Sequence, residues 1–180
     1  NPEVLAAAQD ELLRGMDGMI DHQPPIYVVG GEPAAELKTD GFTLKKVTVD
    51  DRSGVRISAN SDAGVLYGAF DLLRRLQLRE SMETLDYSST PKIARRVLNH
   101  WDDLNRFVER GYAGFSLWEW SYLPEIRSPR YEDYGRALAS LGINGSVITS
   151  VNANALVLTP DYLIKVAGVA DELRPWGVRL

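Results

Sequence analysis

Aromatic and acidic side chains crowd together between residues 99 and 120, in the stretch NHWDDLNRFVERGYAGFSLWEW. A packed core favours the aromatic residues, and a solvated loop favours the acids. A site that stacks a sugar ring and acts on it with carboxylates requires both. This stretch therefore indicates a carbohydrate site. It contains three of the four tryptophans, Trp101, Trp118 and Trp120, and four acidic residues, Asp102, Asp103, Glu109 and Glu119.

Trp101 is the aromatic residue best placed to contact a ligand, because it is the first residue after a predicted strand. Its indole ring can stack on a pyranose or fill the core at the mouth of a barrel. Trp118 and Trp120 alternate around Glu119 as in an extended segment, and we expect them to pack the loop. His100 points away from Trp101 if the strand persists, and it is expected to be a hydrogen-bonded structural residue.

The acidic residues have two interpretations. Inverting glycoside hydrolysis needs two carboxyl groups about 6.5–9.5 Å apart, and Asp102 could reach that separation from Glu109 or Glu119 through loop folding. More often, acids in such a loop cap the next turn or pair with neighbouring arginines, here Arg106 and Arg110. We favour the second interpretation.

The composition disfavours several other kinds of site. The chain has 180 residues, no cysteine and only two histidines, His22 and His100. Thiol chemistry is therefore excluded, and a zinc site or a Ser-His-Asp triad is disfavoured. A net charge of −5 without a basic run disfavours nucleic-acid binding. No apolar run approaches the ~20 residues that span a bilayer. We expect no metal, no nucleic-acid partner and no membrane partner.

The first half of the chain predicts a small α/β domain, residues 1–88. An amphipathic helix is expected over 3–16 and a short strand over 26–31. Two strands lie around a turn at 50–54, and a helix follows with Asn60 or Ser61 as its N-cap. The polar segment 86–92 contains a proline, and we expect the domain boundary there.

The second half, residues 89–180, alternates strands and helices. Strands are expected over 95–101 and 143–151, with a third beginning at 178, and helices over 131–142 and 161–177. This order predicts parallel strands with helical crossovers. In a (β/α)8 barrel the loops after the strands form the catalytic face. Two loops would lie there, 101–130 and 151–158, and the second offers amide donors in SVNANA (150–155).

Two long segments, RRVLNHWDDLNRFVERGYAGFSLWEW and YGRALASLGINGSVITSVNANALVLTPDYL, resemble the microbial α-glucuronidases of glycoside hydrolase family 67. The similarity continues through LRPWGVRL. The preceding ISANSDAGVLYGAFDLLRRLQ is similar to the end of that family's N-terminal domain, a small α/β sandwich also seen before hexosaminidase barrels. The resemblance implies an α/β fold: this N-terminal domain, followed by the first βαβαβ of a TIM barrel, truncated at Leu180.

The resemblance implies an inverting glycosidase of xylan degradation. Its parent would release (4-O-methyl-)glucuronic acid from xylo-oligosaccharides, without a metal or an organic cofactor. The family's catalytic carboxylates come from later strands, so we place no catalytic residue before Leu180 and expect the 180-residue piece alone to be inactive. Trp101 and Val151 match the wall of the family's uronic-acid pocket. Asn152 and Asp102 complete the predicted substrate-binding residues.

Two other functions are open at this point. One is a hexosaminidase-like glycosidase with a similar small N-terminal domain, and the other is a non-catalytic carbohydrate-binding module. The expected partners are glucuronoxylan-derived oligosaccharides and, for the parent, a second copy in a homodimer. We expect a bacterial source. Cytoplasmic, periplasmic and secreted locations all stay open.

Overall fold

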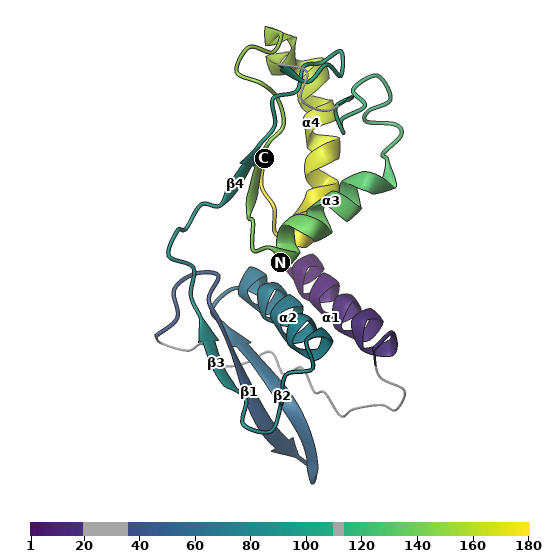
Figure 1. Cartoon of the computed structure of the whole chain (residues 1–180). Helices are drawn as coiled ribbons and strands as arrows, with labels where there is room; N and C mark the ends of the chain where they lie inside the picture. Colours follow the sequence, from purple (N-terminus) through teal and green to yellow (C-terminus); the bar gives the residue numbers. More distant parts are fainter. Residues whose placement is uncertain (20–35, 110–113) are drawn as a thin grey trace. The chain divides into compact units, whose positions relative to one another are not determined.

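The structure, a computed structural model, describes residues 1–19, 36–109 and 114–180. It divides into two compact units, residues 1–94 and 95–180 (Figure 1). The strand predicted over 26–31 lies outside the described residues. A domain boundary after residue 88 stays a prediction. No helix among the described residues is long and apolar enough to cross a membrane.

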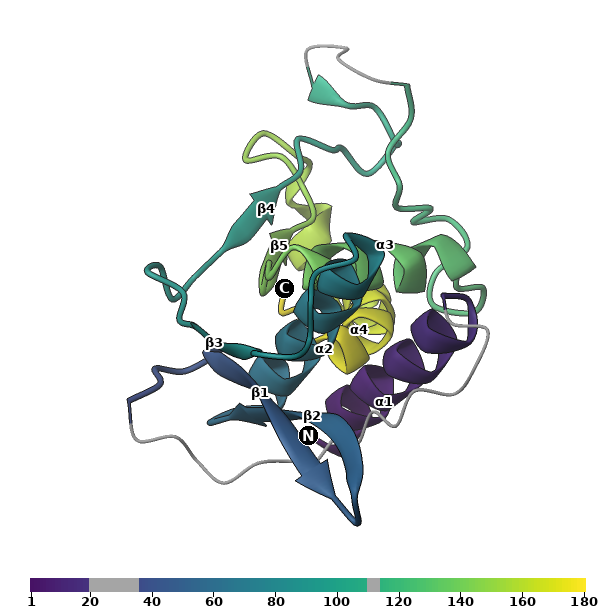
Figure 2. The same cartoon turned by 60° about the horizontal axis from the view of Figure 1, so that its bottom comes forward.

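The first unit joins two helices to a three-stranded antiparallel sheet. Helices α1 (Pro2–Asp17) and α2 (Asp62–Gln77) pack against each other, and α2 also packs on the sheet (Figures 1 and 2). The strand order is β2-β1-β3, with bounds Phe42–Val49 for β1, Arg52–Ala59 for β2 and Asp86–Ser89 for β3. Of the two predicted N-caps it is Ser61 that caps α2, because its hydroxyl accepts the N–H of Gly64.

Strand β3 lies within the polar segment 86–92, where no strand was predicted. Its residues pair in antiparallel register with β1, and Tyr87 lies opposite Leu44. The Tyr87 ring is tilted against Phe42, with 6.2 Å between the ring centroids, and the Arg75 guanidinium lies 3.9 Å from its centre. A polar segment with one aromatic residue thus adds an edge strand, because that single side chain packs on the neighbouring strand and on α2.

The β1–β2 hairpin turns on two residues in the left-handed region. Val49 pairs with Arg52, which leaves Asp50 and Asp51 between the strands with φ angles of 49° and 62°. Two-residue hairpins of this kind favour glycine at the second position.

Asp51→Gly is expected to raise the free energy of unfolding by about 0.5–1 kcal/mol. Urea unfolding followed by circular dichroism measures it. Thr48→Gly within β1 is the control and should destabilise, whereas a loss of stability in Asp51→Gly would contradict this account of the turn.

The second unit is built on two parallel strands. Strand β4 (Val97–Asn99) pairs in parallel with β5 (Gly145–Val147), and α3 (Pro129–Ser140) lies between them in the chain. After β5 come the 3-10 helix η2 (Ala155–Leu158), helix α4 (Pro160–Leu173) and the 3-10 turn η3 (Arg174–Trp176). Arg179 then forms a parallel bridge with Gly145. Both strands are shorter than predicted, with three residues each.

The long loop between β4 and α3 contributes to the core of this unit. Trp118 and Trp120 are completely buried, and so is Tyr131 of α3, whose hydroxyl accepts the N–H of Glu119 at 3.0 Å. The prediction that these two tryptophans pack the loop is therefore confirmed. Buried aromatic rings give a connection without regular secondary structure a fixed path.

Candidate functional site

Two loops meet at the carboxyl ends of β4 and β5. The backbone N–H of His100 donates to the carbonyl of Val147 at 2.8 Å, which extends the pairing by one residue. Beyond it, the N–H of Ser150 donates to the carbonyl of Asp102 at 2.9 Å. Since these bonds join the start of one loop to the start of the other, the segments that follow β4 and β5 lie side by side. The carboxyl ends of parallel strands are where open α/β sheets and barrels bind ligands.

Three of the four predicted substrate-binding residues lie at the surface of these loops. Trp101 is 43% exposed and Val151 is 94% exposed, and Asn152 is exposed as well. They offer an indole face, an apolar branched side chain and an amide. This combination suits a sugar, which presents apolar C–H faces and hydroxyl groups together.

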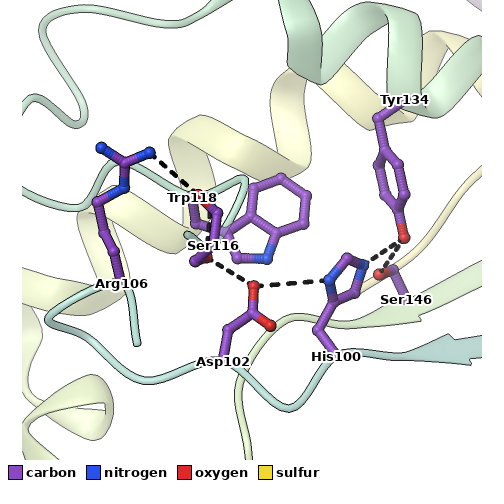
Figure 3. Close-up of polar contacts among 7 residues, drawn as sticks. All are labelled: His100, Asp102, Arg106, Ser116, Trp118, Tyr134 and Ser146. Carbon is purple, nitrogen blue, oxygen red and sulfur yellow. Dashed lines mark hydrogen bonds and ion pairs between the residues drawn. The ribbon is translucent and has the colours of Figure 1, made fainter. Parts of the chain in front are cut away.

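Asp102, the fourth predicted residue, lies beneath the surface and is 4% exposed. Its Oδ2 accepts a hydrogen bond from the Ser116 hydroxyl at 2.6 Å, and the same Ser116 oxygen accepts the N–H of Trp118 at 3.0 Å (Figure 3). The Asp102 carboxylate thus joins the loop near Ser116 to the segment that directly follows β4. A part of Asp102 in substrate binding stays a prediction.

His100 continues this polar network toward α3. Its Nδ1 lies 3.6 Å from Oδ2 of Asp102, and its Nε2 lies 2.6 Å from the hydroxyl of Tyr134, which in turn contacts the Ser146 hydroxyl at 3.1 Å (Figure 3). The imidazole also stands edge-on to the ring of Trp118, at 5.3 Å between centroids. The expectation of a hydrogen-bonded structural histidine is confirmed.

Burial sets the protonation state of this network. It lowers the pKa of His100 below its ordinary value, and the nearby Asp102 carboxylate opposes that shift without cancelling it. Burial likewise raises the pKa of Tyr134. A neutral imidazole with its proton on Nδ1, toward Asp102, accepts a hydrogen bond at Nε2 from the Tyr134 hydroxyl. The network therefore needs no net positive charge on the histidine.

The lowered pKa of His100 predicts acid sensitivity. In the unfolded chain His100 binds a proton below a pKa of about 6.5, whereas in the folded chain it binds that proton only at lower pH. The free energy of unfolding therefore decreases as the pH falls from about 6.5 to the folded pKa. Thermal unfolding between about pH 7.5 and about pH 5.5 should show a falling midpoint, and His100→Gln should reduce that fall. An equal fall in the variant would show that other groups cause it.

Two further acids of the 99–120 stretch, Glu109 and Glu119, have partners in the loops. Glu119 pairs with Arg106 at 3.3 Å, which agrees with the interpretation that we favour. Glu109 accepts hydrogen bonds from Ser150 and Asn152. Pairing with Arg110 falls outside the described residues. Within the described ranges, no three His, Cys, Asp or Glu side chains are grouped so that they could hold a metal ion.

A hollow of about 530 Å³ adjoins the exposed residues and shares Asn152 with them. No sequence pattern predicted it. Its lining combines residues of the first loop, residues at and just before η2, and Tyr162 in the first turn of α4. The lining residues are Asp103, Leu104, Asn105, Asn152, Asn154, Leu156 and Tyr162.

Several curated relatives of this chain are fungal proteins named as α-glucuronidases or probable α-glucuronidases. A "Probable alpha-glucuronidase A" of Aspergillus terreus is 37% identical over 147 residues, which cover 81% of this chain and 17% of that protein. The "Alpha-glucuronidase A" of Aspergillus tubingensis is 36% identical over 146 residues, again 81% and 17%. The chain thus spans about a sixth of the length of these relatives. Their fungal origin contradicts the bacterial source predicted above, and that prediction is wrong.

Two solved structures resemble the fold at low sequence identity. One is described as a GH138 enzyme targeting pectin rhamnogalacturonan II, with a TM-score of 0.65 at 12% identity over 98% of this chain and 22% of the other. The second is a GH115 4-O-methyl-α-glucuronidase with specificity for decorated arabinogalactans, with a TM-score of 0.60 at 16% identity over 98% and 26%. At these identities the likeness shows the α/β fold alone.

Two family models cover most of the chain. The N-terminal domain of glycosyl hydrolase family 67 matches residues 28–72, and the middle domain of the same family matches residues 75–180. The second match alone includes β4, β5 and both loops of the site. The chain belongs to glycosyl hydrolase family 67.

Proposed function

We propose that the whole protein is an inverting α-glucuronidase that releases (4-O-methyl-)glucuronic acid from xylo-oligosaccharides derived from glucuronoxylan. Membership of family 67 and the names of the fungal relatives support it. One observation carries the proposal for this chain. Trp101 and Val151 expose an indole and an apolar side chain at the ends of neighbouring parallel strands.

Each residue of this wall has a distinct role in the proposal. Trp101 stacks on the apolar face of the uronic acid, and Val151 covers an adjoining apolar part of the sugar. The Asn152 amide hydrogen-bonds a sugar hydroxyl. Asp102, next to Trp101 in the chain, holds the path of this loop through its bond to Ser116.

The catalytic acid and base of the proposed reaction lie outside residues 1–180. The partners found for Asp102, Glu109 and Glu119 support this part of the proposal, because each carboxylate is engaged within the loops. An inverting pair needs room for a water and a sugar between two carboxyl groups. We also place the positive charge that recognises the uronate outside residues 1–180, as the family resemblance implies.

The proposal extends to the architecture. The order β4–α3–β5–α4, with a parallel bridge at Arg179, supports the second unit as the first strands and helices of a (β/α)8 barrel. In that barrel the two loops of the site face the catalytic centre. A homodimer of the whole protein stays a prediction.

Release of free uronic acid from aldouronic oligosaccharides tests the function directly. We expect the whole protein to release it, and proton NMR should show the β-anomer first, because the α-link is inverted. Hydrolysis of N-acetylhexosaminides instead would support the hexosaminidase-like alternative. Binding of xylo-oligosaccharides without release would support the binding module.

A further inference from the structure

Glu109 connects the two loops of the site through both oxygens of its carboxylate. Its Oε2 accepts the Ser150 hydroxyl at 2.6 Å, and its Oε1 accepts the Asn152 side-chain amide at 3.0 Å. The backbone N–H of Glu109 donates to the carbonyl of Trp101 at 2.7 Å. Glu109 is thus bonded both to the residue that carries the indole and to the turn that carries Val151.

The turn at Val151 depends on its neighbours for its position. Its side chain is 94% exposed, so packing does not hold it. The residues on either side are held: Ser150 is 7% exposed, and its hydroxyl oxygen also accepts the N–H of Asn152 at 3.1 Å. Since hydrogen bonds to an ionised carboxylate are about twice as strong as neutral ones, Glu109 is the strongest side-chain anchor of this turn.

We infer that Glu109 is a positioning residue of the sugar site, which holds the Val151–Asn152 turn in register with Trp101. The inference rests on the proposed function and adds a residue to it. A binding wall has to hold its groups within about 0.5 Å of their productive places. The Glu109 carboxylate holds the turn in place because each of its two oxygens accepts a hydrogen bond from a residue of that turn.

The variant Glu109→Gln distinguishes a positioning role from a catalytic one, because it replaces the carboxylate with a neutral amide. Glutamine at position 109 keeps an oxygen that accepts from Asn152, and its NH₂ group can donate to the Ser150 hydroxyl, which has lone pairs to accept it. A general acid or base, in contrast, loses its function when it can no longer exchange a proton.

The experiment measures KM and kcat of the whole protein on an aldouronic oligosaccharide. Glu109→Ala should raise KM about tenfold, with kcat changed less than about threefold, because charge-assisted bonds that order the wall are lost. Glu109→Gln should recover most of the KM. In an Asn152→Ala background, Glu109→Ala should raise KM by less than about twofold, since the two residues act together. The exposed Glu125, changed to alanine, is the control.

Two kinetic results would overturn the inference. A fall of kcat by about a thousandfold or more in Glu109→Gln would make the residue a catalytic carboxylate. A wild-type KM in Glu109→Ala would remove any part in positioning.

A second readout needs no substrate. Glu109→Ala and Ser150→Ala should each lower the thermal midpoint, and the double variant should lie no lower than the worse single one. Additive shifts would overturn the inference even if uronic acid is released. If the unmodified protein releases no uronic acid, the proposed function is wrong. The thermal midpoints still show whether Glu109 and Ser150 hold the two loops together.

Discussion

Replacing Trp101 by alanine is expected to reduce kcat/KM of the whole protein on aldouronic oligosaccharides by about 30- to 140-fold. Truncation of a tryptophan that anchors a ligand costs about 2–3 kcal/mol, and every 1.4 kcal/mol corresponds to a factor of ten. Trp101 is 43% exposed at the end of β4, so the change removes contact surface and leaves the buried core in place. Initial rates of uronic acid release across a range of substrate concentrations measure it.

Phe115 provides a matched control for Trp101. It lies on the same loop, is 81% exposed and is not part of the proposed wall. Phe115→Ala should keep wild-type kinetics, and Trp101→Phe should keep part of the activity, because a smaller ring can still stack. Equal losses in Phe115→Ala and Trp101→Ala would show that the loop responds to any lost aromatic residue, and the stacking role would be wrong.

Replacing Trp118 by alanine is expected to lower the free energy of unfolding of the 95–180 unit by about 3–5 kcal/mol. The ring of Trp118 is completely buried and lies between those of His100, Tyr131 and Tyr134, with centroids 5.3, 5.4 and 5.5 Å away. Its removal leaves a cavity under the polar network of Figure 3. All four tryptophans of the chain lie in this unit, so urea unfolding followed by tryptophan fluorescence reports on it.

The comparison with Trp101 makes this prediction specific. Trp101→Ala removes the same side chain from the surface and should cost less than about 1 kcal/mol of stability. Trp118→Phe should cost less than Trp118→Ala, because most of the volume is kept. A stability loss in Trp118→Ala no larger than that in Trp101→Ala would contradict the packing described for this loop.

Much of the fold follows from local pattern. The apolar residues Leu66, Ala69 and Leu73 of α2 recur at the 3.6-residue spacing of a helix and are buried. Ser61, one of the two predicted N-caps, marks the start of α2. Strand β3 was missed because a polar edge strand with one inward aromatic has the composition of a linker.

The exposed residues that follow the strands were predictable from the sequence, whereas the roles of the acidic residues were not. Trp101 and Val151 follow predicted strands, and the carboxyl ends of parallel strands meet at one edge. The roles of the acids depend on how an irregular loop folds back. The bonds of Asp102 to Ser116 and of Glu109 to Ser150 join residues 14 and 41 positions apart in the chain, and no periodicity indicates such pairs.

A crystal structure of the whole protein with bound glucuronic acid would show whether Trp101 and Val151 line the sugar site. We expect the sugar ring to stack on the indole of Trp101, with Val151 in van der Waals contact at about 4 Å and the Asn152 amide within reach of a hydroxyl. A sugar bound elsewhere, with Trp101 and Val151 still in solvent, would contradict the assignment of these loops as the wall of the site.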